Sequence, residues 1–184
     1  MSNQDMWKLL FFISKIFSYL PVPIFNFIWR LSDIFDGNMG AIIRYIFIAG
    51  RLKKCGKLVF FGSRIYIESP ENLSLGNNVS IHHQSTLICS GGIEIGDAVA
   101  IAHNSSILST NHTWNDVSLP IKYNPLDKKN IIIEDDVWIG CGVRILAGSF
   151  IPKRTIIAAG AVLSKKLPSN GIYGGIPAKL IKRL

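Results

Sequence analysis

Aliphatic residues recur at every sixth position over much of this sequence. A period of six fits neither an α-helix, with its ~3.6 residues per turn, nor the alternation of a strand, so each repeat must be a short strand followed by a turn. Three such hexads would close one triangular coil, and stacked coils would bury a continuous column of aliphatic side chains. The spacing therefore predicts a β-solenoid. The repeating positions are Leu75, Ile81 and Leu87, then Ile95, Ile101 and Ile107, and then Ile133, Ile139, Ile145, Ile151, Ile157 and Leu163.

Three near-copies of one seven-residue segment give an independent measure of the coil. They span residues 73–79, 93–99 and 131–137, so the first two are 20 residues apart and the last two are 38 apart. The second interval exceeds one coil by about 20 residues, and this excess must leave the solenoid as a loop. The chain is therefore predicted to have an N-terminal apolar helical arm over 1–54, a β-helix over 55–170 with an excursion loop at 108–130, and a C-terminal segment over 171–184.

Two further motifs accompany the repeat, namely Val137-Trp-Ile-Gly-Cys-Gly142 and Tyr173-Gly-Gly-Ile-Pro-Ala-Lys179. With them, residues 55 to 184 resemble the hexapeptide-repeat acyltransferases, and most of all the galactoside and maltose O-acetyltransferases and their polysaccharide-modifying relatives. The resemblance implies a mainly β fold: a left-handed parallel β-helix with an N-terminal helical arm and a short C-terminal helix. The left hand rests on the resemblance alone, because ordinary parallel crossovers are right-handed in about 98% of cases.

The charge of the chain is unevenly distributed. The net charge is +8, and residues 137–184 contribute eight basic and no acidic side chains. This cationic end would suit a phosphate-bearing cofactor. A nucleic-acid partner is not expected, because aromatic side chains for base stacking are sparse there.

The N-terminal segment is apolar and aromatic, but its longest uncharged run, Ile16 to Trp29, has 14 residues. A membrane-spanning helix needs about 18 or more. Two interpretations of residues 6–29 stay open: a helix that lies in a membrane interface, and a helical arm that packs on a neighbouring subunit. The three cysteines have no paired or metal-type spacing, which favours a reducing compartment. We therefore expect a cytoplasmic protein, which under the first interpretation is peripheral on the inner face of the membrane.

All four histidines lie between residues 82 and 112, and His112 stands at the start of the predicted excursion. In the resembling acetyltransferases, a histidine at this point is the catalytic base. A neutral imidazole can take the proton of a sugar hydroxyl as its oxygen attacks a thioester, and can return the proton to the leaving thiolate. We therefore expect His112 to be catalytic.

Three side chains are candidates for binding the acceptor sugar. His83 stands where the resemblance would place an Asn that touches the acceptor, so it departs from the family pattern. Asn104 could approach the acceptor or only stabilise a turn. Trp114 could form an apolar wall of the sugar site or only anchor the loop. Asp116 and Asp127 could orient a histidine or grip a sugar, although loop carboxylates are more often solvated.

The resemblance also implies a site for acetyl-CoA, and no metal. Cys141 would lie beside the thioester, and its backbone N–H would donate to the oxyanion. An acyl-cysteine intermediate is the alternative. Lys179 and Lys182 stand where arginines often contact phosphate, and lysine supplies the charge without the bidentate fork. The implied cofactor-binding set is Trp138, Gly140, Cys141, Ala159, Ser164, Lys165, Lys179 and Lys182.

These features predict an acetyl-CoA-dependent O-acetyltransferase that modifies a sugar hydroxyl of a cell-surface polysaccharide or its lipid-linked precursor. The resemblance implies a homotrimer with each active site between neighbouring subunits. N-acetylation of an amino sugar is the nearest alternative, because the base and the cofactor site would be the same. A non-catalytic scaffold is another. A metal lyase of the γ-carbonic anhydrase type fits poorly, because the resemblance would require two of its zinc-binding histidines to be five residues apart, and the chain has no such pair.

Overall fold

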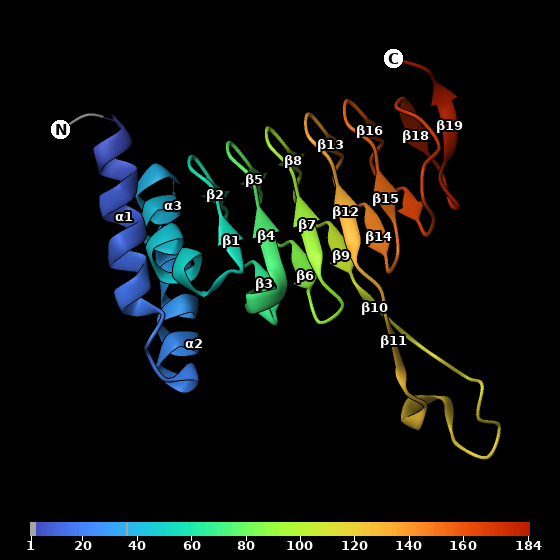
Figure 1. Cartoon of the computed structure of the whole chain (residues 1–184), viewed down its shortest axis with the longest axis horizontal. Coiled ribbons are helices and arrows are strands. Elements are labelled where there is room, and N and C mark those ends of the chain that lie inside the picture. Colours follow the sequence, from blue (N-terminus) through green and yellow to red (C-terminus); the bar gives the residue numbers. More distant parts are fainter. Residues whose placement is uncertain (1–2, 36) are drawn as a thin grey trace.

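The chain forms a parallel β-solenoid of about six turns with helices at its N-terminal end (Figure 1). In this computed structural model, residues 3–35 and 37–184 are described. Three largely parallel sheets form the walls of the solenoid, and each regular coil contributes one strand to each wall. The predicted β-solenoid with N-terminal helices is confirmed.

The three walls, called sheets A, B and C, share one register. Sheet A contains β1 (Lys54–Cys55), β4 (Leu73–Leu75), β7 (Ile93–Ile95), β12 (Ile131–Ile133) and β15 (Phe150–Ile151). Sheet B contains β2 (Phe60–Phe61), β5 (Ser80–Ile81), β8 (Ala100–Ile101), β13 (Trp138–Ile139), β16 (Ile156–Ile157), β18 (Ile172–Gly174) and β19 (Lys179–Lys182). Sheet C contains β3 (Tyr66–Glu68), β6 (Thr86–Ile88), β9 (Ser106–Leu108), β14 (Arg144–Leu146) and β17 (Val162–Leu163). Leu73, Ile93 and Ile131 are register partners, so the two sequence intervals each correspond to one coil, as predicted.

The sixth-position aliphatic residues form the core. Ile101, Ile139 and Ile157 are register partners on neighbouring coils of sheet B, and each is 0% exposed. Side chains alternate between the two faces of a strand, so the residue before each of these lies on the outer face. Each coil therefore buries its apolar face against the coils above and below it.

The corner between sheets B and C, called the BC corner, has the same backbone conformation in five successive coils. One residue in each turn is left-handed, with φ between 56° and 70°. Glycine adopts this conformation freely and asparagine tolerates it, whereas most other residues pay an energetic penalty there. Because the conformation repeats, equivalent corner residues lie one coil apart, at about the 4.8 Å spacing of neighbouring strands. The left-handed positions are Arg64, Gln84, Asn104, Gly142 and Gly160.

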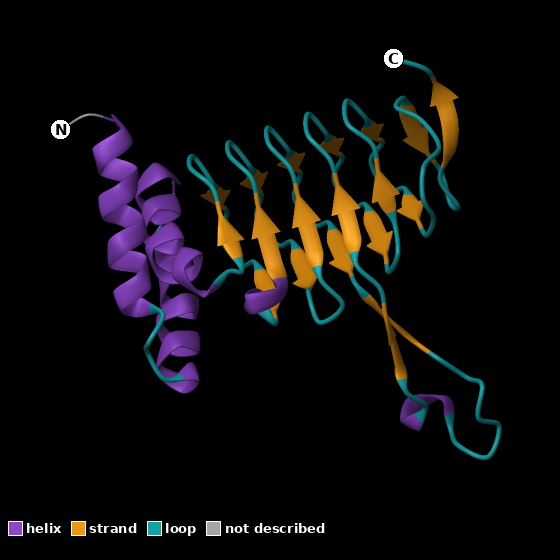
Figure 2. Ribbon diagram, viewed as in Figure 1, coloured by secondary structure: helices purple, strands orange, loops and turns teal. Residues whose placement is uncertain are grey.

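Helices cover the N-terminal end of the solenoid (Figure 2). Trp7 packs edge to face on Tyr45, with 5.2 Å between ring centroids. Trp29 Nε1 donates a hydrogen bond to Ile65 O in the first coil at 3.1 Å. This segment therefore packs on the solenoid of its own chain. Its elements are α1 (Asn3–Phe17), α2 (Val22–Leu31), the 3-10 turn η1 (Ser32–Ile34), α3 (Gly37–Ile48) and the 3-10 turn η2 (Ala49–Arg51).

A buried arginine joins the helices to the first coil. Arg44 is 2% exposed, and its Nε donates to Phe61 O at 2.8 Å. Its Nη1 donates to Ser32 O at 2.9 Å and to Phe35 O at 3.0 Å. A guanidinium is tolerated in such a place because its N–H groups meet acceptors. These bonds tie α3 and η1 to β2.

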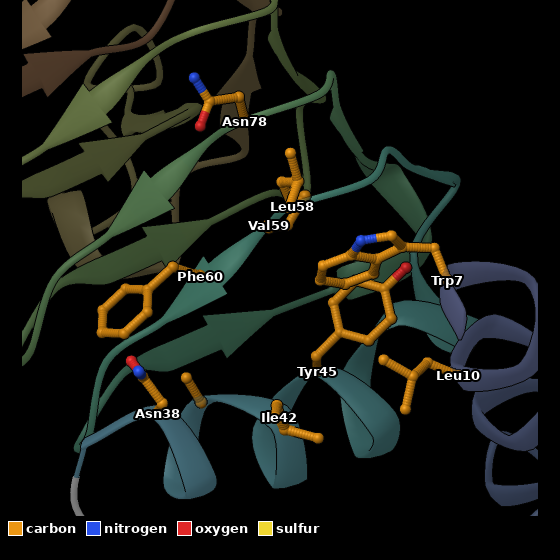
Figure 3. A pocket seen from close by; sticks show the side chains of 10 residues that line it. Trp7, Leu10, Asn38, Ile42, Tyr45, Leu58, Val59, Phe60 and Asn78 are labelled. Carbon is orange, nitrogen blue, oxygen red and sulfur yellow. The ribbon is translucent and has the colours of Figure 1, made fainter. Parts of the chain in front are cut away.

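An apolar pocket of about 450 Å³ lies where α1 and α3 meet the first coil (Figure 3). Two amide side chains reach it, Asn38 from α3 and Asn78 from the solenoid. None of the residues predicted for catalysis, acceptor binding or cofactor binding lines it. The lining residues are Trp7, Leu10, Asn38, Ala41, Ile42, Tyr45, Leu58, Val59, Phe60 and Asn78.

The outer faces of α1 and α2 carry exposed apolar side chains. Phe12 is 64% exposed and Phe27 is 68% exposed. No acidic residue occurs from Met6 to Ser32, whereas three basic residues do, Lys8, Lys15 and Arg30. Among residues 3–35 and 37–184, no helix combines the length and apolarity needed to cross a membrane.

The excess residues leave the solenoid after β9, at the corner between sheets C and A, and return at β12 (Figure 1). They form an excursion in which β10 (Thr110–His112) pairs antiparallel with β11 (Leu126–Lys128). The short 3-10 turn η4 (Ile121–Tyr123) lies between these strands, and a similar turn, η3 (Pro70–Asn72), occupies the same corner two coils earlier. A polar excursion of this kind lies outside the core, where functional loops are usually found.

The predicted short C-terminal helix is wrong. After β18 the chain turns at residues 175–178 and returns as β19, antiparallel to β18. Gly175 has a φ of 93°, and Pro177 has no N–H to donate, so this segment favours a turn over a helix. The last strand instead forms the edge of sheet B.

Candidate functional site

The excursion holds His112 in an open pocket of about 550 Å³. His112 is the last residue of β10, and its side chain is exposed. Trp114 lines the same pocket and is 71% exposed. The structure thus brings together the predicted base and one predicted acceptor residue, and none of the predicted cofactor residues lies with them. The lining residues are Asn111, His112, Thr113, Trp114, Asn115, Asp127 and Lys129.

Asn124, which the sequence did not single out, braces the excursion. Its side chain is 5% exposed, and its Nδ2 donates to Asp116 O at 3.2 Å and to Leu119 O and Pro120 O at 3.3 Å. Its Oδ1 accepts from the Asp116 N–H at 3.0 Å. Nothing in the spacing marks this residue, because an asparagine in a polar loop is usually exposed.

The two loop carboxylates are engaged away from His112. Asp116 Oδ1 accepts from the Ser118 Oγ–H at 2.5 Å and from the Ser118 N–H at 2.9 Å. These bonds from the side chain and backbone of Ser118 hold the pKa of Asp116 below its ordinary value. Asp127 forms an ion pair with Lys129, with Oδ2 and Nζ 2.5 Å apart. Within residues 3–35 and 37–184, therefore, no carboxylate hydrogen-bonds to the His112 imidazole.

A second group of predicted residues forms a column at the BC corner. His83, His103 and Cys141 occupy equivalent positions on three successive coils. The Asn104 N–H donates to His83 O and the Gly142 N–H donates to His103 O, each at 3.1 Å. The His83 and His103 rings stack with centroids 5.1 Å apart and planes 6° apart. The predicted acceptor residue His83 therefore lies in line with the residue predicted to sit beside the thioester.

The sequence contained a signal for this column that the prediction did not use. His83 and His103 are 20 residues apart, and His103 and Cys141 are 38 apart. The same two intervals separate the three near-copied segments. The spacing that predicts the length of each coil therefore also predicts that these three side chains lie above one another on neighbouring coils. His103 could have been named with His83 on this basis.

Asn104 holds a left-handed corner position with a φ of 59°. Its backbone carbonyl accepts from Arg144 Nη1 at 2.7 Å. Its side chain is exposed and hydrogen-bonds to no group in the described parts of the chain. The turn therefore uses the backbone tolerance of asparagine and leaves its amide available to a ligand.

The peptide N–H of Cys141 differs from those on either side of it. The Gly140 N–H donates to Ile157 O at 2.8 Å, and the Gly142 N–H donates to His103 O at 3.1 Å. The Cys141 N–H donates to no group within residues 3–35 and 37–184. A free N–H on a rigid corner is suited to stabilising an oxyanion. The Cys141 side chain is half-buried.

Small residues extend from Cys141 towards the C-terminal coils. The Gly160 N–H donates to Cys141 O at 2.8 Å, so Ala159 is the equivalent residue one coil on. A Cβ atom on Gly140 would stand 2.6 Å from Ala159 N, which shows how closely the two turns approach. Trp138, on the outer face of sheet B before this corner, is 54% exposed. A flat strip of small side chains beside an exposed indole fits an extended, unbranched arm such as pantetheine.

The other predicted cofactor residues lie on two different walls. Ser164 and Lys165 follow β17 in sheet C, whereas Lys179 and Lys182 belong to β19 in sheet B. All four are exposed. One chain therefore gathers Gly140, Cys141 and Ala159 but does not gather the whole set into one pocket.

His82 precedes this column and contributes a third imidazole. Burial and the nearby charges of His83 and His103 lower the pKa of His82. In the part of the chain that the structure describes, no group of three or more His, Cys, Asp or Glu side chains is arranged to hold a metal ion. The histidines thus share a surface without a chelating geometry.

No protein-family model matches the chain. A Mycobacterium tuberculosis protein assigned as an acetyltransferase is 32% identical over 128 residues, which cover 69% of this chain and 43% of that protein. A Saccharomyces cerevisiae protein with the same assignment is 32% identical over 155 residues, which cover 84% of this chain and 75% of that protein. An Escherichia coli protein assigned to O-acetyl transfer in lipopolysaccharide biosynthesis is 26% identical over 134 residues, which cover 72% of this chain and 65% of that protein. The chain thus spans less than half of the length of the mycobacterial relative.

Two solved structures share the fold over most of their length. The hexapeptide-repeat acetyltransferase of Vibrio cholerae, complexed with acetyl-CoA, has a TM-score of 0.75 and 25% identity, covering 85% of this chain and 83% of that chain. A maltose O-acetyltransferase from Clostridium difficile has a TM-score of 0.77 and 27% identity, and the match covers 88% of this chain and 85% of that chain.

Proposed function

The chain belongs to the hexapeptide-repeat acetyltransferase family, and from this premise we propose that it is an acetyl-CoA-dependent O-acetyltransferase acting on a sugar hydroxyl of a cell-surface polysaccharide or its precursor. The likeness to a maltose O-acetyltransferase and to a protein assigned to lipopolysaccharide O-acetylation supports oxygen as the acceptor atom. Transfer to the amine of an amino sugar is the alternative, because the same base and the same thioester would serve it.

The proposed reaction is a direct transfer. His112 takes the proton of the acceptor hydroxyl while the hydroxyl oxygen attacks the carbonyl carbon of the thioester. The Cys141 N–H donates to the carbonyl oxygen as negative charge develops on it. The carbon–sulfur bond then breaks, and the departing thiolate receives the proton from His112.

The observation that carries this proposal is the free N–H of Cys141 at the point where the column changes from imidazoles to small side chains; within the described residues, the equivalent His83, His103 and Ala159 also have a free N–H. The Cys141 N–H lies on a corner whose backbone is fixed by the coils on both sides, so it needs no rearrangement to meet an oxyanion. The adjoining strip of small residues supports a thioester arm at this place. We assign Trp138, Gly140, Cys141, Ala159, Ser164, Lys165, Lys179 and Lys182 to acetyl-CoA.

We further propose that the active unit is a homotrimer. The excursion with His112 leaves from the corner between sheets C and A, whereas Cys141 lies at the BC corner. A neighbouring copy related by a threefold axis could bring the excursion of one subunit against the BC corner of the next. His83, Asn104 and Trp114 would then face the acceptor in the cleft between the two copies.

We also propose that residues 6–29 rest on the inner face of the membrane. Exposed apolar side chains on α1 and α2, with three basic and no acidic residues from Met6 to Ser32, suit an anionic lipid surface. This position would serve a lipid-linked acceptor. The protein should sediment with vesicles that contain phosphatidylglycerol, and Phe12→Ser with Phe27→Ser should abolish this. Failure of the unaltered protein to sediment would leave packing on a neighbouring subunit as the role of the arm.

Acetyl transfer from acetyl-CoA to neutral and acidic sugars tests the proposed reaction. His112→Ala should lower transfer by about 10²-fold or more, while oligomeric state and acetyl-CoA affinity stay unchanged. Lys122→Ala, an exposed change in the same excursion, is the control. Near-normal transfer by His112→Ala would exclude this residue as the base. Mild alkali removes an O-acetyl ester and leaves an N-acetyl amide, so the mass of the treated product separates the two acceptor atoms.

A further inference from the structure

Two stacked imidazoles lie on the N-terminal side of Cys141 at the BC corner. Their rings are nearly parallel, with centroids 5.1 Å apart. The backbones of His83 and His103 are each fixed by a hydrogen bond from the next coil. Both side chains are exposed. The pair is therefore a rigid, solvent-facing group of ring nitrogens one and two coils from the proposed transfer site.

A guanidinium is held beside this pair. Arg144 Nη1 donates to Asn104 O at 2.7 Å and to Val143 O at 3.2 Å. Both acceptors belong to the turns that carry His103 and Cys141. A guanidinium has five N–H groups, so bonds from one nitrogen to the corner leave others for a ligand.

No carboxylate is present in the turns of this corner to neutralise these groups. The first coil adds the exposed Arg64, and His82 adds an imidazole whose ring lies 5.5 Å from that of Phe60. Asp33 contacts the far end of the column, where its Oδ1 accepts a hydrogen bond from the Arg64 N–H at 2.7 Å. The corner segments without Asp or Glu are 62–65, 82–85, 102–105, 140–143 and 158–161.

We propose that this corner recognises a carboxylate on the acceptor, so that the preferred substrate is an acidic sugar of the uronic acid class. The inference rests on the proposed function, because the reacting hydroxyl must reach Cys141. The remainder of the acceptor then extends along the column over His103 and His83, at about 4.8 Å per coil. The cofactor is proposed to lie on the opposite, C-terminal side, where Ala159 and the lysines are, so its phosphates do not occupy these imidazoles.

The physical basis is the set of hydrogen-bond donors that this corner offers. A carboxylate bound there accepts hydrogen bonds from the ring N–H groups of His83 and His103 and a charge-assisted bond from the Arg144 guanidinium. The corner segments contain no Asp or Glu that would compete for these donors. A neutral hydroxymethyl group at the same place carries no charge to pair with the guanidinium, so the acidic acceptor is preferred.

Matched pairs of methyl glycosides and methyl glycosiduronic acids of glucose, galactose and mannose configuration test the inference. The ratio of kcat/KM for the acid to that for the neutral sugar is measured at pH 7. The contribution of His112 cancels in this ratio, because the same base serves both acceptors. We expect the acid to be preferred by about tenfold. Equal rates, or preference for the neutral member, in the unaltered protein would overturn the inference.

Substitutions at the BC corner test whether His83, His103 and Arg144 cause the preference for the acidic sugar. His83→Asn with His103→Asn, and separately Arg144→Gln, should bring the ratio towards one with the oligomeric state unchanged. Lys153→Gln, which removes an exposed cation at another corner, should leave it unaltered. A ratio that survives both corner variants would show that these residues do not recognise the acid. If neither member of any pair is acetylated, the result counts against the proposed function itself. If both members are acetylated at equal rates, the result counts only against the preference for an acid.

Discussion

Replacement of Asn104 by glycine or by valine separates a backbone role from a contact with the acceptor. The residue is left-handed, with a φ of 59°, and its side chain is exposed and without a hydrogen bond in the described residues. Glycine adopts this conformation freely, so Asn104→Gly should keep the stability of the protein. A β-branched residue cannot do so without a penalty of about 1–2 kcal/mol, so Asn104→Val should lower the free energy of unfolding by that amount.

The same pair of variants reports on the acceptor. One hydrogen bond from the Asn104 amide contributes about 0.5–1.5 kcal/mol, so its loss in Asn104→Gly should raise the acceptor KM roughly two- to tenfold with little change in kcat. Urea unfolding at fixed protein concentration gives the first quantity, and initial rates over a range of acceptor concentrations give the second. Gln84 occupies the equivalent position one coil earlier, so Gln84→Gly is a matched control for the backbone change.

If Asn104→Val were as stable as the unaltered protein, the left-handed backbone conformation at residue 104 would be refuted. An unchanged KM in the glycine variant would remove the side chain from the acceptor site and leave Asn104 as a turn residue. The two results are independent, so each part of the reasoning can fail alone.

Three further predictions address the cofactor side and the core. Cys141→Ala should keep kcat within about threefold, because the backbone N–H remains, whereas an acyl-cysteine mechanism would lose activity altogether and show an acetylated protein by mass spectrometry. Lys179→Gln with Lys182→Gln should weaken acetyl-CoA binding roughly three- to tenfold at low salt and less at high salt; calorimetry that finds equal affinity would remove both lysines from the site. Ile139→Ala should cost about 2–5 kcal/mol in urea unfolding, and a loss below about 1 kcal/mol would contradict the stacked core.

The solenoid was predictable because its core is periodic in the sequence itself. Ile101, Ile139 and Ile157 follow one frame and are all fully buried. The interval from Leu73 to Ile93 then gave the register of the coils without any knowledge of the side-chain packing. Where burial repeats at a fixed spacing, the sequence contains enough information to place each strand.

The C-terminal strand and the roles of Asn124 and Arg144 could not be predicted in this way, because they depend on contacts that do not repeat along the sequence. The C-terminal helix failed because Gly175 and Pro177 favour a turn, and the chain gained hydrogen bonds by pairing back on β18. The role of Asn124 depends on carbonyls that converge only when the excursion folds. Arg144 was counted as one more charge at the cationic end, whereas its bond to Asn104 O sets it against the BC corner.

The two ends of the solenoid also bear on self-association. A stack of parallel strands exposes unpaired N–H and C=O groups at each end, and such edges invite pairing with other molecules and growth into fibres. Helices cover the first coil, and at the other end β19 closes sheet B as a reversed strand that carries Lys179 and Lys182. Charged side chains on an edge strand discourage further pairing. The reversed, lysine-bearing strand therefore disfavours end-to-end pairing along sheet B, the wall that it covers.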